Sequence, residues 1–568
     1  MEKRWVPTSI CNDDTVKNIA EQLNIDRSLA QILVQRNICD FDQAKYFFRP
    51  ELAHLHDPFL MKDMDKAIQR IEQALSTHEK ILIYGDYDVD GTTSVALAYS
   101  FFSQLTENIE YYIPDRYLEG YGISTAGIDY ANENGFSLII ALDCGIKSLD
   151  KVDYANSFGI DFIICDHHLP GEEIPKAVAV LDPKRLDCEY PFKELAGCGI
   201  GFKLAQAYAQ KHGLPSESYL QYLDLVMVSI AADIVPVVGE NRILAYYGLK
   251  KLNTNPCEGL RALMEVSGKT EHYTITDVVF TLGPRINAAG RIDHAKHAVA
   301  MLLCQVDSNS LEQSESINLK NTERKTYDQD ITREALALIG DSDILINRKT
   351  TVVFNENWHK GVIGIVASRL TEKYYRPTIV LTKSNGQVAG SCRSVVGFDL
   401  YEALSGCAHL LDQFGGHKFA AGLTMQEHNV EALADKFEEI VSASITEELL
   451  TPMIKIDAEI ELAQIDGKFF RVLSQMGPFG PENLSPVFLS NNVYLDRTPM
   501  AVGANHLKIN IKQQNSPTFE CIAFGLGEFQ NLLQPKVPFS VCYTIEENVW
   551  REKRRLQLNI KGIKIKEY

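Results

Sequence analysis

Short apolar runs alternate with helix-compatible segments from about residue 80 onward, and this alternation limits the possible fold more than any other feature. The runs are ILIY (81–84), SLIIAL (137–142), FIIC (162–165) and AVAVL (177–181). The stretches between them, such as TTSVALAYSFFSQL, space their apolar residues as a helix does. Strands that alternate with helices build a parallel sheet flanked by helices. We therefore expect an α/β domain here.

Acidic residues and histidines directly follow three of these runs. Open α/β sheets bind ligands outside the carboxyl ends of their strands, so these groups are expected to lie together. Taken singly, a strand-end Asp is more often a helix cap, and paired histidines are often a solvated loop. Together, carboxylates this close raise one another's pKa unless a cation keeps them ionised, and carboxylate with imidazole suits Mn²⁺ or Mg²⁺. The residues are Asp86, Asp88, Asp90, Asp143, Asp166, His167 and His168.

The segment DLVMVSIAADIVPVVGEN predicts a buried apolar helix that ends at Asp233, before a turn that contains proline. The simplest interpretation is that this acid only begins the turn. The helix dipole opposes a negative charge at its C-terminus, however, and a nearby cation would relieve that opposition. Asp233 is therefore a further candidate for a metal site.

Three later segments combine glycine or alanine with side chains that bind anions. Small residues let the backbone approach a ligand, and a guanidinium can hold a phosphate through two hydrogen bonds. Surface arginines are also commonly solvated, so both interpretations stay open. The segments are TLGPRINAAGRIDHA with Arg285, Asn287 and Arg291, GSCRS with Ser391 and Arg393, and QFGGHKFAAG with Gly415, Gly416 and His417.

Several function classes are disfavoured. The glycine-rich segments GCGIGFK (197–203) and GYGISTAG (120–127) lack the spacing or the context of nucleotide-binding loops, and no GxSxG elbow is present. Twelve cysteines without a CxxC pair predict free thiols. No uncharged apolar run reaches the roughly 18 residues of a membrane span, so we expect a cytoplasmic protein. The net charge of -19 argues against a polycation that coats DNA, yet it permits a local basic groove.

The length of 568 residues predicts three or four domains. Residues 305–339 are polar and contain neither proline nor glycine, which predicts a long connecting helix. A second α/β pattern follows, and short alternating strands after about residue 450 predict a small β-barrel or sandwich. The expected parts are a helical segment (1–78), an α/β core (79–304), a connecting helix (305–342), a second α/β domain (343–450) and a β-domain (451–568).

Four motifs in this order, GDYDVDG, LDCG, CDHH and ADIVP, resemble the DHH phosphoesterase superfamily. With PDRYLEGYG (114–122), GPRINAAGR (283–291), SCRS (391–394) and FGGH (414–417), nearly the whole chain resembles the bacterial single-stranded-DNA exonucleases of that superfamily. The resemblance implies two α/β domains, a parallel-sheet DHH core and a DHHA1-type domain, joined by a long helix, and a C-terminal OB-like barrel. It also implies a 5′ to 3′ exonuclease in recombination and repair, which releases mononucleotides with two divalent cations, Mn²⁺ or Mg²⁺.

The resemblance further implies roles for single residues. His168 is expected to contact the scissile phosphate, and Asp166 to orient the histidines. Asp143 is expected to bridge the two metals, and Asp86 to be a ligand or to support one. The other implied metal ligands are Asp88, Asp90, His167 and Asp233.

DNA contacts are implied in the same way. Arg285, Asn287 and Arg291 are expected to hold the DNA backbone beside the metals. The implied 5′-phosphate pocket consists of Arg116, Ser391, Arg393, Gly415, Gly416 and His417, and Cys392, where a glycine is usual, is expected to narrow it. The implied partners are single-stranded DNA, a single-strand DNA-binding protein and a RecQ-type helicase, with no membrane contact and a monomeric state.

The last stretch gathers basic residues near aromatic ones, which suits a groove that stacks single-stranded bases. A charged outer face of a solvated sheet is the alternative. The candidate groove residues are Trp550, Arg551, Lys553, Arg554 and Arg555, with Tyr543, Lys561, Lys564 and Lys566 nearby.

Two other functions remain open within the resemblance. One is a phosphodiesterase of short oligoribonucleotides or cyclic dinucleotides, although such proteins generally lack the terminal OB-like domain. The other is an inactive replication scaffold, which would have lost the metal aspartates. Pyrophosphatase-like relatives in the superfamily carry a metal-binding histidine where this chain has Tyr84. This difference weighs against a pyrophosphatase-like function. GPFGPENLSPVF (477–488) differs from the usual GPFGxGNPxP, so the contacts of the terminal domain are expected to differ.

Overall fold

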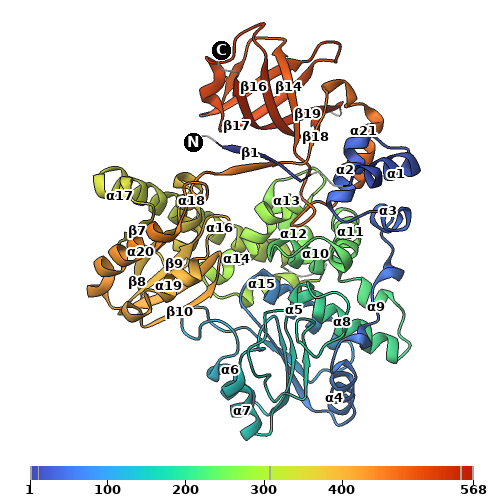
Figure 1. Ribbon diagram of the computed structural model, residues 1–568. Coiled ribbons are helices and arrows are strands. Elements are labelled where there is room, and N and C mark those ends of the chain that lie inside the picture. Colours follow the sequence, from blue (N-terminus) through green and yellow to red (C-terminus); the bar gives the residue numbers. More distant parts are fainter. Residues whose placement is uncertain (1–2, 10–11, 306–308, 385, 551–552, 566–568) are drawn as a thin grey trace. The chain divides into compact units, whose positions relative to one another are not determined.

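The computed structural model describes residues 3–9, 12–305, 309–384, 386–550 and 553–565 (Figure 1). Its contacts divide the chain into two compact units. The larger unit comprises Trp5–Asn287, Ala295–Ser314 and Ile454–Tyr568, and the smaller unit comprises the remaining segments, chiefly Glu315–Met453.

A five-stranded sheet forms the centre of the first domain, as the apolar runs predict. Its strands are β2 (Lys80–Gly85), β3 (Ile109–Tyr112), β4 (Phe136–Leu142), β5 (Asp161–Cys165) and β6 (Ala179–Leu181), in the order β3-β2-β4-β5-β6. The neighbouring strands are parallel in every pair. Their carboxyl ends therefore share one edge, where the acidic motifs begin.

Helices cover both faces of this sheet. Helices α6 (Thr125–Glu133) and α7 (Leu149–Ser157) pack on the face that carries Leu82, Ile139 and Phe162. Alternation along a strand sends Ile83 and Ile140 to the other face. Helices α5 (Val89–Phe102) and α8 (Gly197–Lys211) contact the strands there, and α10 (Leu223–Ala232) packs on both of them.

The other helices of this region extend the domain. They are α4 (Met64–Ser76), α9 (Glu217–Leu220), α11 (Gly239–Thr254), α12 (Glu258–Ser267), α13 (Ile275–Asp277), the π-helix η3 (Val278–Leu282), α14 (Gly283–Ile292) and α15 (Lys296–Leu302). Helix α14 begins in the larger unit and ends in the smaller one.

The terminal β-domain is a closed sheet. Its strands are β13 (Ala458–Glu459), β14 (Phe488–Leu495), β15 (Met500–Val502), β16 (His506–Lys512), β17 (Phe519–Phe524), β18 (Phe539–Trp550) and β19 (Lys553–Ile565). They follow the order β13-β14-β18-β19-β17-β16-β15, and pairing of β14 with β16 closes the ring. Tyr543 lies wholly inside it and shares a hydrogen bond with Ser490, so Tyr543 cannot stack on bases.

The N-terminal helices share the core of this β-domain. Helices α1 (Asp13–Leu23), α2 (Arg27–Gln35), α3 (Phe41–Phe48) and, within the β-domain, α21 (Gly467–Gln475) join one apolar cluster with its strands. The expected all-helical start is wrong in one detail, because strand β1 (Arg4–Pro7) pairs with β12 (Met453–Ile456). The start of the divergent 477–488 segment is held by Arg242, which donates hydrogen bonds to the carbonyls of Met476 and Gly477.

The smaller unit is built on a mixed sheet. Its strands β7 (Thr351–Phe354), β8 (Thr378–Ser384), β9 (Gln387–Arg393), β10 (Gln413–His417) and β11 (Ala420–Met425) follow the order β10-β11-β9-β8-β7, and only β7 and β8 are parallel among these pairs. Its helices are α16 (Ser310–Gly340), the predicted connecting helix, α17 (Asp343–Asn347), α18 (Ile363–Tyr374), α19 (Leu400–Ser405) and α20 (Val430–Ser444).

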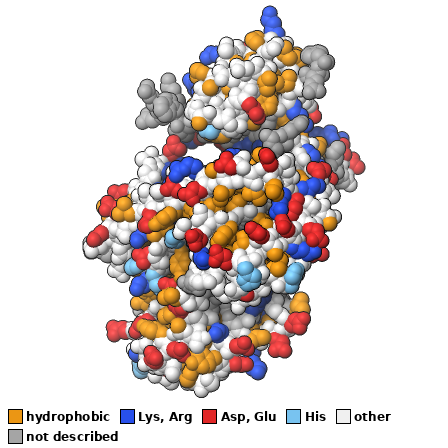
Figure 2. Space-filling view, turned by 90° about the vertical axis from the view of Figure 1, so that its left-hand side faces the viewer, with side chains coloured by type: hydrophobic (Ala, Val, Ile, Leu, Met, Phe, Trp, Pro, Cys, Tyr) orange, Lys and Arg blue, Asp and Glu red, His pale blue; other side chains and the backbone are white. Residues whose placement is uncertain are grey.

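Three further observations bear on the sequence predictions. Acidic and basic side chains are interspersed over the face drawn in Figure 2, so the net negative charge does not form one uniformly acidic face there. Within the described ranges, no helix is both long enough and apolar enough to cross a membrane. Each cysteine that the structure describes is a free thiol, as predicted.

Candidate metal centre

The first acidic motif folds tightly between β2 and α5. Asp88 caps α5, because its carboxylate accepts a hydrogen bond from the Gly91 amide at 3.0 Å. A Cβ at Gly91 would lie 2.3 Å from the Asp86 carbonyl oxygen, so only glycine allows the loop to close this tightly. The fold thereby holds Asp86, Asp88 and Asp90 at the carboxyl edge of the sheet.

Asp90 is fixed by the start of α8. The amides of Gly197 and Cys198 each donate a hydrogen bond to its carboxylate at 2.7 Å, and the Ser229 hydroxyl donates a third at 2.7 Å. Backbone amides at a helix N-terminus favour a negative charge. Asp90 is only 2 % exposed, so these donors set its orientation and leave little freedom.

Asp143 follows β4 in a left-handed backbone conformation, with φ at 59°. Asp tolerates this region better than most residues. Its amide donates to the Cys165 carbonyl at 2.9 Å, which ties the end of β4 to the end of β5. Gly197 packs directly on its side chain, since a Cβ there would lie 2.8 Å from the Asp143 Cβ.

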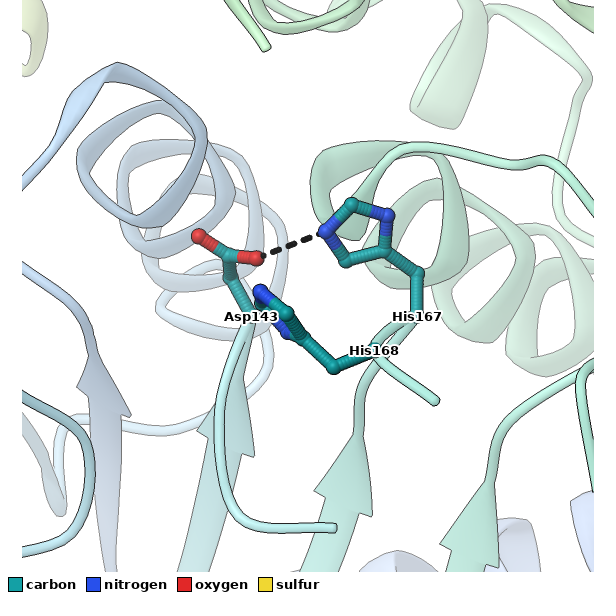
Figure 3. A group of neighbouring side chains, drawn as sticks. All are labelled: Asp143, His167 and His168. Atoms are coloured by element: carbon teal, nitrogen blue, oxygen red, sulfur yellow. Dashed lines mark ion pairs between the residues drawn. The ribbon is translucent and has the colours of Figure 1, made fainter. Parts of the chain in front are cut away.

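His167 lies at the centre of the acidic residues. Its Nε2 atom is 3.2 Å from a carboxylate oxygen of Asp143, 3.6 Å from one of Asp233 and 3.7 Å from one of Asp90. Figure 3 shows Asp143 and both histidines at the ends of neighbouring strands, with the His167 ring directed at Asp143. Two groups of three residues each place their ligand atoms within 4.8 Å of one another, which is close enough to hold one metal ion per group. The groups are Asp90, His167 and Asp233, and Asp143, His167 and His168.

His168 is held from both sides. Asp166 accepts hydrogen bonds from His168 Nδ1 at 2.7 Å and from the Ile146 amide at 2.9 Å, and His168 Nε2 lies 3.0 Å from the Tyr121 hydroxyl. Burial opposes the charge, but these bonds lower the pKa of Asp166 to about 2. Burial likewise opposes the imidazolium, yet the bond to Asp166 raises the pKa of His168 to about 9. Asp166 therefore holds the ring of His168 in place, and its role in the reaction stays a prediction.

The carboxylates that face one another cannot all be ionised without a cation. Burial, followed by the neighbouring charges of Asp90 and Asp88, raises the pKa of Asp233 to about 8. Burial and neighbouring acids also raise the pKa of Asp86, of Asp88 and of Asp143. A bound cation reverses this effect, because it favours the charged form.

The unsatisfied atoms of the site fit metal ligation. Both ring nitrogens of His167 and one carboxylate oxygen of Asp86 are buried, and none has a hydrogen-bond partner among the described residues. Buried polar atoms without partners are unfavourable unless a ligand satisfies them. Carboxylates with one or two imidazoles are the ligands that Mn²⁺ and Mg²⁺ accept. The residues present therefore fit divalent cations.

Arg116 is the predicted DNA-binding residue that lies beside this edge. Its guanidinium carbon is 4.6 Å from the ring centre of Tyr87. The positive charge of Arg116 acts to lower the pKa of Asp86 and of Asp88. This cation therefore stands within electrostatic range of the acidic motif.

A second group of predicted residues gathers on the sheet of the smaller unit. The guanidinium of Arg393 donates to the hydroxyls of Ser391 at 3.1 Å and Ser368 at 3.2 Å, and Arg393 acts to lower the pKa of His417 after burial, which lowers it most. A Cβ at Gly364, near the start of α18, would lie 3.0 Å from the Ser391 hydroxyl, so this face admits a close approach. We call Ser391, Arg393 and His417 the Arg393 cluster.

Cys392 does not belong to that face. Successive residues of a strand point to opposite sides of the sheet, and Cys392 is buried in the apolar core with Ile379 and Leu400. The expectation that Cys392 narrows the pocket of Ser391 and Arg393 is therefore wrong.

The three residues predicted to hold the DNA backbone lie on helix α14, but not all on one face of it. Residues four apart share a helix face, so Asn287 and Arg291 lie together while Arg285 does not. Arg285 is 9 % exposed and donates to the Thr281 carbonyl at 2.7 Å, and Arg291 donates to the Gly361 carbonyl at 2.9 Å. A joint role of the three residues stays a prediction.

The predicted basic groove is described only in part. The side chains of Trp550 and Lys553, and residues Arg551 and Lys566, lie outside the described part of the chain. Arg554 and Arg555 are exposed, with carboxylates of Glu547 and Glu520 at 3.2 and 3.7 Å. Lys564 stands 4.8 Å from the ring centre of Trp5. The groove stays a prediction.

Sequence reasoning missed four groups that support the metal centre: the amides of Gly197 and Cys198, the Ser229 hydroxyl and the Tyr121 hydroxyl. The segment GCGIGFK is no phosphate loop, but its first residues begin α8 and hold Asp90. No spacing rule connects positions 139 residues apart, such as Ser229 and Asp90. Gly197 and Tyr121 stand in glycine-rich segments, which is the one signal that could have identified them.

A parallel sheet whose carboxyl edge carries these carboxylates and the Asp-His-His motif defines a phosphoesterase domain of the DHH class. Family comparison agrees: residues 80–230 match the DHH family, N-terminal domain, residues 347–443 match the DHHA1 domain and residues 456–562 match the RecJ OB domain. The chain is 37% identical over 562 residues to the single-stranded-DNA-specific exonuclease RecJ of Bacillus subtilis (strain 168), which covers 98% of this chain and 70% of that protein. The chain belongs to the RecJ family.

Solved structures of the family agree with the fold. The crystal structure of RecJ from Thermus thermophilus in complex with Mn²⁺ matches with a TM-score of 0.85 at 26% identity, over all of this chain and 80% of that chain. The corresponding complex with Mg²⁺ matches with a TM-score of 0.79 at 26% identity, over all of this chain and 79% of that chain. The OB domain and the two α/β domains predicted from the sequence are thus confirmed.

Proposed function

We propose that this protein is a single-stranded-DNA-specific exonuclease that removes mononucleotides from the 5′ end by metal-dependent hydrolysis of the phosphodiester bond. The observation that carries the proposal is the convergence of Asp90, Asp143 and Asp233 on the unsatisfied nitrogen of His167. The relatives of the chain are named single-stranded-DNA-specific exonucleases, and two solved structures of the family are complexes with Mn²⁺ and Mg²⁺.

The residues that would hold two divalent cations are Asp88, Asp90, Asp143, His167 and Asp233, with Asp86 as a ligand or support. When bound, such a pair supplies a water of lowered pKa and positive charge for the leaving oxygen. Asp90 is held in place by three donors, so it presents its remaining lone pairs in one direction. Fixed ligands of this kind reduce the reorganisation that binding requires.

His168 supplies a positive charge next to the ligands. The imidazole is held between Asp166 and Tyr121, and its pKa of about 9 keeps it protonated at neutral pH. A preorganised cation near the metals stabilises the negative charge that develops on the phosphate during hydrolysis. We assign this role to His168.

The 5′ polarity needs a separate end-binding site. We assign it to the Arg393 cluster with Gly415 and Gly416 in the smaller unit, following the family motif, and we assign a further phosphate contact to Arg116 in the larger unit. The support from the structure is the face of Ser391 and Arg393 in the smaller unit, where the Arg393 guanidinium lies within 3.2 Å of two serine hydroxyls, those of Ser368 and Ser391. A terminal phosphate is the ligand that such groups bind.

The wider setting follows from the substrate. We infer that the enzyme acts as a monomer in the cytoplasm, in DNA recombination and repair. Partnership with a single-strand DNA-binding protein and a RecQ-type helicase stays a prediction.

The test is digestion of an internally labelled oligonucleotide, with free or blocked ends, in the presence of Mn²⁺. The wild type is compared with Asp143→Asn, because asparagine tolerates the left-handed backbone of this position while it removes the charge. Asp153→Asn, at an exposed acid on α7, is the matched control. We expect mononucleotides only from substrates with a free 5′ end, and no product with Asp143→Asn. Cleavage of dinucleotides alone would instead favour a phosphodiesterase of short oligonucleotides.

A further inference from the structure

The DHH domain carries a pocket directly beside the metal centre that the catalytic residues do not use. It has a volume of about 530 Å³ and is lined by Leu169, Lys184, Leu186, Lys193 and Glu194, among others. Leu169 follows His168 in the chain, so this wall of the pocket begins one residue from the metal site. We call it the Lys184 pocket.

Two leucines expose apolar surface in this pocket. The exposed fraction is 69% for Leu169, and Leu186 is fully exposed. A single exposed leucine on a protein surface needs no explanation. These two, however, line the same pocket. An apolar group of a ligand is the natural partner for them.

The charge of the pocket suits an anion. Arg185 is committed to the fold, because Asp63 and Asp187 accept its hydrogen bonds at 2.7 to 2.9 Å. Lys193 donates a hydrogen bond to the Cys188 carbonyl at 2.6 Å, and no carboxylate takes part in that bond. Lys184 has the Glu194 carboxylate at 3.4 Å, and both side chains are partly exposed. A phosphate could compete for Lys184 at such an exposed pair.

The fold also holds Lys184 at the edge of the sheet that carries the metal ligands, because it lies three residues after the end of β6. Lys184 is anchored close to the site because its amide donates to Asp182, the residue that follows β6 on the same edge of the sheet, at 2.7 Å. The apolar walls suit the base of a nucleotide, and the two lysines suit its phosphate. The pocket also begins beside His168, where a bound substrate strand would pass.

We propose that the Lys184 pocket binds the nucleotide on the 3′ side of the scissile phosphate, with its phosphate on Lys184 and Lys193 and its base against Leu169 and Leu186. This placement rests on the proposed function, in which the terminal nucleotide on the 5′ side is held through the Arg393 cluster. The pocket then explains how the enzyme holds the strand that remains after each cleavage.

The experiment measures KM and kcat for the first cleavage of short 5′-phosphorylated oligonucleotides. Each is made intact or with an abasic site at the nucleotide 3′ of the first linkage. The variants are Lys184→Ala and Leu186→Ala, and Leu186→Ala removes a side chain that is fully exposed, so the fold is retained. Lys80→Ala is the control, since Lys80 begins β2 at the opposite end of the sheet from the metal centre.

We expect the wild type and Lys80→Ala to bind the intact substrate more tightly than the abasic one. Leu186→Ala should lose this preference, and Lys184→Ala should raise KM roughly 3- to 10-fold for both substrates, with the loss in KM rather than kcat. The slope of log KM against log salt should also fall by about 0.7 in Lys184→Ala, the value for one phosphate contact on a single strand. Glu194→Gln should lower KM, because it frees Lys184.

Two results would overturn the placement. In the first, Lys184→Ala and Leu186→Ala match Lys80→Ala in KM, base preference and salt slope. In the second, the variants weaken inhibition by added dTMP but leave KM unchanged, which would make the pocket a site for released product. Failure of the proposed function is distinct from both, because the wild type would then not digest the intact oligonucleotide at all.

Discussion

His168 Nδ1 donates a hydrogen bond of 2.7 Å to Asp166, and this contact both helps to orient the histidine that faces the metal centre and favours its charged form. Replacement by Asp166→Asn keeps the size of the side chain but removes its charge. We expect kcat to fall roughly 10- to 100-fold, as is typical when a residue that hydrogen-bonds to an active-site group and orients it is replaced. The measurement is kcat on a 5′-phosphorylated oligonucleotide at saturating Mn²⁺.

The same contact predicts a pH dependence. The bond to Asp166 raises the pKa of His168 to about 9, so the imidazolium is present below that pH and is lost as the pH rises through it. We expect activity to decline above about pH 9 in the wild type and at lower pH in Asp166→Asn, where the charge that raises the pKa is gone. A pH profile with the same alkaline limb in both proteins would show that His168 is not needed as a cation. Asp153→Asn should retain the profile of the wild type.

Substitution of Gly197 by alanine is expected to lower activity without a matching loss of stability. A Cβ there would meet the Cβ and a carboxylate oxygen of Asp143 at 2.8 and 2.9 Å, so Gly197→Ala must displace a metal ligand. A displacement of about 1 Å in an active site lowers rates on the order of 100-fold. We expect a loss of that size in kcat with little change in Tm.

Gly199→Ala is the matched control on the same helix. Its Cβ would meet only the Leu195 side chain, at 3.4 Å, and alanine favours a helix over glycine by up to about 1 kcal/mol. We expect full activity and an unchanged or higher Tm. Equal activity of the two alanine variants would mean that the start of α8 does not constrain Asp143.

The sequence predicts those parts of the site that depend on strand ends and local motifs. Asp86, Asp143 and His167 follow apolar runs, and the parallel order of the strands brings them to one edge. What the sequence does not predict are contacts between distant segments, such as the hydroxyl of Ser229 on the carboxylate of Asp90. Those contacts depend on how α5, α8 and α10 pack, which no local pattern specifies.

Side-chain direction is the other limit of the sequence. Cys392 and Tyr543 each stand beside candidate binding residues in the chain, yet both point into an apolar core. Alternation along a strand decides this, and the strand register is fixed only by pairing with neighbours far along the chain. A motif therefore locates a binding segment without showing which of its residues face the ligand.

Ser229 predicts a change in metal affinity. Its hydroxyl is fully buried and donates to Asp90 at 2.7 Å, so Ser229→Ala leaves one carboxylate oxygen with one fewer donor. We expect the Mn²⁺ concentration for half-maximal activity to rise roughly 10-fold, with a similar kcat at saturating metal. Ser94→Ala is the comparison, because the Ser94 hydroxyl lies 3.4 Å from the same oxygen and contributes less. An unchanged Mn²⁺ dependence in Ser229→Ala would remove Ser229 from the support of the site.

Lys203 predicts the largest effect on stability. It is fully buried on α8, with the Glu240 carboxylate at 2.7 Å, and Glu240 also accepts hydrogen bonds from the Tyr190 hydroxyl at 2.6 Å and the His56 amide at 2.9 Å. Lys203→Met leaves a buried carboxylate without its cation, which typically destabilises a protein by about 3 to 5 kcal/mol.

Lys211→Met is the control on the same helix, since Lys211 pairs with Glu72 at the surface and such pairs contribute less than about 1 kcal/mol. We expect thermal melting to show a large decrease in Tm for Lys203→Met, a small one for Lys211→Met, and partial recovery in Lys203→Met with Glu240→Leu. If the double variant melts lower than Lys203→Met alone, the hydrogen bonds of Tyr190 and His56 to Glu240 outweigh the burial of its charge.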